Sequence, residues 1–447
     1  SGGSGITNGV DGEITYTVTN CYYLTDTASG GLDGADVAGQ AEAIDNTAFA
    51  RQSAFVNWDF ENVWKIDNTL SRPILREIPE SAGKTEITSL VISTLAELQA
   101  FRDSVNAGND YSGTTVMLAA DIDLGGRVND DYGIITYENQ WTPIGTLDKP
   151  FAGTFNGGDH KISGLCINDV PGNGFQGLFG RSSGTIQNLS VSGDVRSMDY
   201  TGGIVGKNEG SILNCHHDGV VGNAGRRADT IGGITGYNLG SIINCSHSGA
   251  VAPDSSSEQV GGIVGWNEGS ITNCHNDGTV GGNMFIGGIA GNNDGSISGC
   301  YNTGAISGHE WAGGIVDSNG TKAIVSNCYN TGSIGASSTG GVVRTNGGTV
   351  INCYNTGRVS GSSYIGGIVS TCSGTVTNCY SVGSIRGNSA VGGIAGNNLL
   401  GNLSNCYYLA DTAAGGIGHS GTTASDDVAG QAEPVPKTAF AQQSTFV

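Results

Sequence analysis

Charged residues are scarce in this chain, and basic residues are the scarcest of them. Only 13 % of the 447 residues are charged, with 19 Lys and Arg against 40 Asp and Glu, so the formal net charge is −21. A surface this acidic repels phosphate, which argues against binding to nucleic acid or to anionic membranes. The sequence also has no run of about 18 apolar residues, so it predicts no helix that spans or inserts into a membrane.

Proline is rare as well, with 8 residues, whereas glycine is abundant, with 77 residues of 447. The glycines do not occupy every third position, so the chain is not a collagen triple helix. Hydrophobic residues make up 37 % of the chain, which is enough for a core and argues against a wholly disordered protein.

Most of the glycines belong to a repeat of about 26–30 residues that recurs nine times between Gly177 and Gly396. Each copy reads GGIVG, a short turn, GSIxNC, a polar or aromatic pair and GxVxG. After a divergent first copy at Gly177, the copies begin at Gly202, Gly232, Gly261, Gly287, Gly313, Gly340, Gly366 and Gly392. Repeats of this length are typical of solenoids, in which each unit packs only on its neighbours.

Each copy contains three short β-prone runs, for example residues 262–264, 270–274 and 278–280, and glycines separate them. We interpret these glycines as the positive-φ corners of a three-sided coil. Coils stacked about 4.8 Å apart would bury a continuous core of Ile, Val and Cys. The sequence therefore predicts an all-β fold, a right-handed parallel β-helix (β-solenoid) with three strands per coil, whose nine coils form a rod roughly 40–45 Å long.

Two further features precede or interrupt the repeats. Residues 94–108 (TLAELQAFRDSVNAG) have helical spacing, a capping box at Thr94 and Glu97, and a C-cap at Gly108, which predicts an N-terminal amphipathic capping helix. Such a cap would cover a sheet edge that otherwise aggregates. Insertions at residues 222–229 and 253–259 predict loops at one corner of the early coils, where solenoids often bind their ligands.

The two ends of the chain resemble each other. NCYYL at residues 20–24 recurs at 405–409, and ARQSAFV at 50–56 recurs as AQQSTFV at 441–447. We therefore expect about one period of a tandem array. Its predicted parts are 1–80, a tail resembling the end of a preceding solenoid unit; 81–176, the capping helix and first coils; 177–409, the solenoid core; and 410–447, the start of an exit or linking segment.

The repeats resemble the GLUG motif, which is named for its Gly-Leu/Ile-x-Gly core, over residues 177–409. Residues 118–124, 141–145 and 155–157 are similar to segments that precede such repeats. The resemblance implies a bacterial surface or secreted protein, an adhesin-like stalk or an accessory region that sometimes lies beside a peptidase domain. The resemblance brings no catalytic residue with it.

Three short motifs could suggest chemistry, and none has the context that the chemistry needs. His309 begins an H-E pair, but Gly313 stands where a zinc peptidase has its second His. The G-x-G-x-x-G run starting at Gly172 has no βαβ context for a dinucleotide. Asp121 and Asp123 could form a calcium or glycosidase pair, although a structural role at a coil corner explains them as well.

One cysteine per repeat occupies the same position, which predicts stacked core thiols rather than disulfides. These residues are Cys215, Cys245, Cys274, Cys300, Cys328, Cys353, Cys379 and Cys406. Soft-metal binding with nearby histidines is the alternative, but strand alternation places Cys215 and His216 on opposite faces. The Asn before most of these cysteines predicts an amide ladder at residues 214, 244, 273, 327, 352, 378 and 405.

Tyrosine follows the cysteine in the later copies and predicts an outward aromatic row. Its members are Tyr301, Tyr329, Tyr354, Tyr380 and Tyr407. Packing between coils explains such a row, and glycan stacking is the functional alternative.

Taken together, these patterns predict a non-enzymatic, extracellular rod with a structural or adhesive role on a bacterial surface. We expect it to be one unit of a tandem or head-to-tail array, whose partners are neighbouring copies or adjacent repeats and possible glycans or a host surface. The alternatives are a glycan-binding module that uses the Tyr row, and an accessory domain of a secreted peptidase or polysaccharide-degrading enzyme. No catalytic residue, metal or cofactor is predicted.

Overall fold

The computed structural model describes residues 89–438 apart from 130–134, 138, 169–173, 198–199, 224–229, 253–256, 420–424 and 427–429. Before residue 89 it describes Phe55 and six short strands: β1 Val10–Asp11, β2 Ile14–Thr15, β3 Cys21–Leu24, β4 Ala41–Ile44, β5 Trp64–Asp67 and β6 Arg72–Leu75. Contacts divide the chain into two compact units, Ser1–Glu86 and Ile87–Val447.

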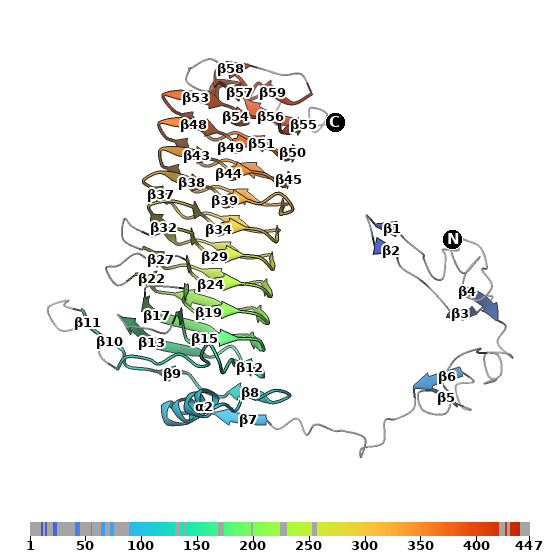
Figure 1. The fold of residues 1–447 in the computed structure, drawn as a ribbon, viewed down its shortest axis with the longest axis vertical. Helices are drawn as coiled ribbons and strands as arrows, with labels where there is room; N and C mark the ends of the chain where they lie inside the picture. Colours follow the sequence, from blue (N-terminus) through green and yellow to red (C-terminus); the bar gives the residue numbers. More distant parts are fainter. Residues whose placement is uncertain are drawn as a thin grey trace. The chain divides into compact units, whose positions relative to one another are not determined.

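The second unit is a stack of coils joined by parallel strands (Figure 1). One parallel sheet of 12 strands runs along the whole stack, from β7 (Ser89–Ile92) through β8 (Thr115–Leu118) and β12 (Thr154–Asn156) to β55 (Asn402–Ser404), so there are about twelve coils. Strands of successive coils pair in register, as Ile212 does with Ile242. The chain is therefore the all-β parallel solenoid that the repeat predicts, with crossovers of the usual right-handed type.

Each regular coil contains five short strands, so the prediction of three was wrong. In one coil these are β23 (Ile231–Gly232), β24 (Thr235–Asn238), β25 (Ser241–Ile243), β26 (Ser246–His247) and β27 (Ala250–Val251). The backbone bends after Gly232 and again at Asn244, and these bends split runs that look continuous in the sequence. The five strands contribute to four parallel sheets, because the last two join the same sheet.

Asparagine supplies the positive φ at the corner before the cysteine in every regular coil except that of Cys300, where Gly299 does so with φ 65°. The asparagines at this corner have φ between 50 and 55°: Asn188, which precedes Leu189, and Asn214, Asn244, Asn273, Asn327, Asn352, Asn378 and Asn405, which precede cysteines. Their side chains form the predicted amide ladder in two runs, one through residues 188, 214 and 244 and one through residues 327, 352, 378 and 405; Asn244 Nδ2 donates to Asn214 Oδ1 at 3.1 Å. Asn tolerates this left-handed conformation better than most residues with a side chain, which explains its place at this corner.

The paired glycines of GGIVG are needed for close approach and not for positive φ, which corrects the prediction. A Cβ atom on Gly233 would lie 2.4 Å from the ring of His247, and one on Gly262 would lie 2.5 Å from Cγ of Asn276. Both distances are far inside van der Waals contact. The second glycine of each pair therefore makes room for a buried side chain of the sheet opposite.

The interior holds two apolar clusters. The larger contains the inward Ile, Val and Cys side chains, such as Ile234 and Cys245, and the smaller contains a second row that includes Ile231 and Val251. His247 lies between Cys245 and Val251 along the chain, and it packs on Gly233. A buried row of mainly polar side chains therefore follows the boundary between the two clusters.

The predicted helix is present as α2 (Leu95–Ala107), beside β7 and β8 at one end of the stack (Figure 1). Thr94 Oγ1 accepts the Glu97 amide at 3.3 Å, and the Glu97 carboxylate accepts the Thr94 amide at 3.0 Å, which completes the capping box. Gly108 closes the helix with φ 118°. Leu98, Phe101 and Val105 are buried in the larger cluster.

The same pair of parallel strands occurs in both units. In the first unit β3 pairs with β4, so that Cys21 faces Ala41 and Leu24 faces Ile44. In the second, β56 (Cys406–Leu409) pairs with β59 (Ala432–Val435), so that Cys406 faces Ala432 and Leu409 faces Val435. The resemblance between the two ends of the sequence therefore extends to strand pairing and register.

Candidate functional site

The predicted tyrosine row forms a continuous stack of rings on successive coils. The ring centroids of Tyr301, Tyr329, Tyr354 and Tyr380 are 4.9, 4.9 and 5.0 Å apart, with interplanar angles of 3–4°. His275 extends the stack by 4.7 Å from Tyr301. Tyr407 lies in register with Tyr380 on the next strand.

This geometry leaves little of the ring faces for a ligand. Each inner ring has a neighbour on both faces, so mainly the ring edges and hydroxyl groups reach the surface. Burial raises the pKa of Tyr301, Tyr354 and Tyr380, so these hydroxyls stay protonated at neutral pH. The row therefore acts as packing between coils, and glycan contact at these residues stays a prediction.

A second aromatic row lies on another part of the solenoid, and the sequence reasoning missed it. Phe175 of β14 (Phe175–Gln176) is 5.2 Å from Tyr200 of β18 (Tyr200–Gly202) between ring centroids. Tyr200 is 5.6 Å from Tyr237, and Tyr237 is 5.6 Å from Trp266 of β29 (Val264–Asn267). A signal was available, because Tyr237 and Trp266 both follow the last glycine of the GGIVG element.

Charged groups fix this second row at its flanks. Lys207 Nζ lies 5.8 Å from the centre of the Phe175 ring and 5.7 Å from that of Tyr237, within range of a cation–π interaction. The same amine pairs with Glu209 at 2.8 Å, and Arg181 Nη2 also pairs with Glu209 at 2.8 Å. The result is a half-buried aromatic surface with ordered cations and carboxylates.

Tyr237 and Trp266 are also held by hydrogen bonds to acidic side chains. The Tyr237 hydroxyl donates to Glu268 at 2.6 Å, and Trp266 Nε1 donates to Asp294 at 3.0 Å. Burial and then the Glu268 carboxylate raise the pKa of Tyr237. Each polar tip is therefore bonded while the ring body packs along the stack.

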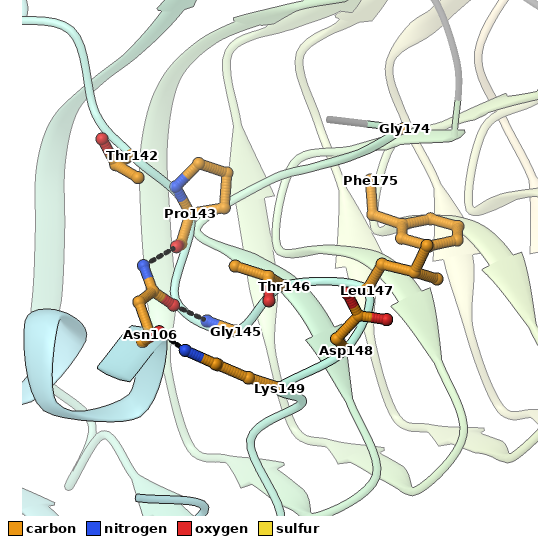
Figure 2. Close-up of a pocket in the computed structure, with 10 residues that line it drawn as sticks. All are labelled: Asn106, Thr142, Pro143, Gly145, Thr146, Leu147, Asp148, Lys149, Gly174 and Phe175. Atoms are coloured by element: carbon orange, nitrogen blue, oxygen red, sulfur yellow. Dashed lines mark hydrogen bonds between the residues drawn. The ribbon is translucent and has the colours of Figure 1, made fainter. Parts of the chain in front are cut away.

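A pocket of about 580 Å³ lies between helix α2 and the start of this row (Figure 2). Its lining combines apolar and polar groups: Asn106, Thr142, Pro143, Gly145, Thr146, Leu147, Asp148, Lys149, Gly174 and Phe175. Asn106 Nδ2 donates to the Pro143 carbonyl at 3.0 Å, and Asn106 Oδ1 accepts the Gly145 amide at 2.8 Å. The volume is within the range of roughly 300–1,000 Å³ that is typical of small-ligand sites.

The repeated cysteines are buried, as predicted. The ten described cysteines are all buried and form no disulfide. The Cys245 amide lies 3.3 Å from Cys274 Sγ, and the same contact recurs between Cys274 and Cys300. Burial raises the pKa of Cys245 and Cys328, so these thiols are neutral packing groups.

The histidines near the cysteines have separate structural roles. His216 is half-buried and its Nδ1 lies 2.8 Å from Ser246 Oγ, whereas Cys215 points into the core, in agreement with the predicted alternation. His217 and His247 are fully buried in the row between the two apolar clusters. Across the part of the chain that the structure describes, no group of three or more His, Cys, Asp or Glu side chains could hold a metal ion.

The remaining candidate motifs lie in structural settings. Asp121 accepts the Lys161 amide at 2.9 Å and is 3.2 Å from His160 Nδ1, while Asp123 Oδ1 accepts the Gly125 amide at 2.9 Å. His309 lies in a bend between two solenoid strands, where no helix could present a zinc-binding face.

Of the two predicted insertion loops, residues 224–229 and 253–256 lie outside the described residues. The described helices include none that is both long and apolar enough to cross a membrane.

Several known proteins are similar to this chain. A relative, Halomucin from Haloquadratum walsbyi, is 34 % identical over 141 residues, which is 29 % of this chain and about 1 % of the length of that relative. A crystal structure from Bacteroides ovatus, described as a candidate immunoglobulin A1 protease, is 21 % identical, covers 55 % of this chain and 76 % of its own, and has a TM-score of 0.41. An IgA1 protease structure has 18 % identity and a TM-score of 0.33 over 75 % of this chain and 22 % of its own.

The family model of the GLUG motif matches residues 256–281. In the structure this segment holds the strands of one coil, from β28 (Val260–Gly261) into β32 (Thr279–Gly282). The motif is therefore the sequence of a single coil. The predicted resemblance is confirmed, and this chain carries the GLUG motif.

Proposed function

We propose that this chain is a non-enzymatic, extracellular rod with a structural or adhesive role. In this proposal it is one unit of a tandem or head-to-tail array on a bacterial surface. Helix α2 caps the first coil and prevents its open strand edge from pairing at random. The acidic net charge of −21 keeps such rods apart along their sides, so that contacts form at their ends.

The observation that carries the proposal is the strand pair found in both units. The first unit holds β3 and β4 in the register that β56 and β59 adopt at the last coil of the solenoid. A segment with the pairing of a last coil, placed before a second solenoid, is what a tandem array requires. We infer that residues 1–80 belong to the end of a preceding solenoid or complete the end of a neighbouring copy.

The recurring side chains support a mechanical role over a catalytic one. Asn side chains bond from coil to coil, as Asn238 does to Asn267 at 2.7 Å in a buried ladder. The cysteines pack in the interior and the Tyr rings stack on each other. These Asn, Cys and Tyr side chains contact their equivalents on the next coil, and these contacts stiffen the rod.

Sedimentation velocity of the full chain tests this proposal. Over a concentration series, we expect association of residues 1–447 that is lost when residues 1–86 are removed, because the second unit is compact without them. The matched control mixes the truncated chain with the full chain, and it should cap the growing assemblies and shorten them. A full chain that stays monomeric, with residue 21 cross-linking to residue 409 of the same molecule, would refute the head-to-tail proposal.

A further inference from the structure

The second aromatic row ends at the pocket. Phe175 belongs to β14, the first strand of its parallel sheet, and the order of that sheet runs β14, β18 and β23. Tyr200 of β18 therefore stacks on one side of Phe175, while no described strand precedes β14 in the sheet. Phe175 also lines the pocket of Figure 2. Among the described residues it is thus the last ring of this row, and its side chain forms part of the pocket wall.

The loop that forms the opposite wall of the pocket is held in place before any ligand arrives. Lys149 Nζ donates to the carbonyls of Asn106 and Ala107, at 3.1 and 3.2 Å, at the C-terminal end of α2. A cation at that end also interacts favourably with the helix dipole. Arg181 donates to the Leu147 carbonyl from the other side while it pairs with Glu209. A wall fixed in this way costs little ordering entropy on binding.

The chemistry of the lining combines a flat apolar surface with hydroxyl and carboxylate groups. Phe175, Pro143 and Leu147 are apolar, and Leu147 is 58 % exposed. The hydroxyls of Thr142 and Thr146 and the carboxylate of Asp148 belong to the same lining. A few polar groups around an aromatic surface are typical of sites that orient a small ligand.

We propose that this pocket binds a neutral pyranose of a glycan chain, with one face of the sugar stacked on Phe175. The axial C–H groups of a pyranose carry slight positive charge and suit the negative face of an aromatic ring. Its hydroxyls can bond to the Asp148 carboxylate and to the threonine hydroxyls. A neutral sugar is favoured because the chain carries a net charge of −21, which repels anionic glycans.

This site is distinct from the Tyr301–Tyr380 row and does not depend on the proposed array. In that row the inner rings cover each other at 4.9–5.0 Å, whereas Phe175 is at the end of its stack. The binding site would therefore lie near one end of the rod, beside α2, and not along its length (Figure 1).

Saturation-transfer difference NMR on the full chain tests the proposal with maltohexaose, cellohexaose, xylohexaose and mannohexaose as probes. We expect saturation of the pyranose ring protons of at least one probe, and titration calorimetry then measures its Kd. Phe175→Leu keeps an apolar side chain but removes the aromatic face, so it should weaken binding about tenfold or more. Asp148→Asn tests the polar contact without touching the stack and should also weaken binding.

Phe285→Leu is the matched control, because it makes the same change at a ring that pairs with Trp311, outside the pocket and both rows, and it should leave the Kd unchanged. Circular dichroism of each variant checks that the solenoid is intact. The proposal is overturned if no probe binds the wild-type chain, or if Phe175→Leu binds as tightly as Phe285→Leu does. It is equally overturned if Phe175→Leu changes only the sedimentation of the chain, since the pocket would then receive a second copy.

Discussion

Acid should destabilise this solenoid through the buried pair of His217 and His247. Both side chains are completely buried, their rings stack 5.3 Å apart, and their Nδ1 atoms are 3.2 Å apart. Nδ1 of His247 is also 3.1 Å from the His217 carbonyl. A neutral pair can place one proton between the two Nδ1 atoms, whereas two charged rings would direct two N–H groups at each other.

The size of the effect follows from the pKa values. Burial lowers the pKa of His247 from 6.5 to about 4, and burial together with the neighbouring His247 lowers the pKa of His217 well below its usual value. Between about pH 6.5 and pH 4 the histidines of the unfolded chain bind protons, whereas the buried histidines of the folded chain do not. The free energy of unfolding therefore falls as pH falls from about 6.5 towards 4. At about 1.4 kcal/mol per pKa unit, His247 alone accounts for about 3 kcal/mol.

The later coils supply the replacement that tests this reasoning. Asn276 occupies the same register position as His247, and its Nδ2 donates to Asn302 at 2.8 Å in a buried ladder. The double variant His217→Asn/His247→Asn should therefore keep the fold and lose the acid sensitivity. The smaller side chains leave some space, so a cost of about 1–3 kcal/mol at neutral pH is expected.

Urea unfolding followed by circular dichroism, at several pH values between about 7 and 4.5, measures the difference. We expect the gap in stability between wild type and double variant to shrink or reverse as pH falls. His309→Asn, the same change at an exposed position, is the control and should follow the wild-type curve. A gap that stays constant over the whole range would refute the role of the buried pair.

Three further predictions concern packing. Arg344→Met should cost about 3–5 kcal/mol, because the fully buried Asp317 carboxylate now accepts bonds of 2.7 and 2.8 Å from that guanidinium, and thermal unfolding checks it. Gly262→Ala should cost at least about 1–3 kcal/mol, since its Cβ would lie 2.5 Å from Asn276, whereas Gly281→Ala has no atom closer than 3.8 Å and should change the unfolding midpoint little. The ten described thiols should stay unreactive to Ellman's reagent until the chain unfolds, because all are buried.

A specific result would contradict each of these three predictions. An Arg344→Met variant as stable as wild type would mean that Asp317 finds another partner or water. Equal midpoints for the two glycine variants would show that the paired glycines are not needed for close approach. Rapid labelling of several thiols in the native chain would contradict the stacked core.

The sequence predicted the features that repeat and missed those that depend on contacts between distant segments. The regular position of Cys245 and the Asn244 before it was enough to place a core thiol and a corner amide. The capping box at Thr94 was predicted because its hydrogen bonds are local. The predicted number of strands was wrong because the bends that divide a coil, after Gly232 and at Asn244, fall inside runs that look continuous in the sequence.

The pocket at Phe175 could not be found from the sequence for the same reason. Its wall combines Asn106 of the helix, the loop that includes Lys149 and the first strand of a sheet, which lie up to about 70 residues apart. Only the stacking of coils brings them together. The contrast between Cys215 and His216 alone does not indicate the buried histidine row, because the alternation continues and the next residue, His217, is buried.

The most direct test of the central claim is cryo-electron microscopy of the full chain at increasing concentration. About twelve coils at 4.8 Å spacing predict a rod of about 55 Å for each molecule. If this chain is one unit of an array, the rods should lengthen in steps of one solenoid, with the strand pair of β3 and β4 at each junction. Single rods of constant length, with residues 1–86 folded onto the last coil of their own molecule, would contradict the account.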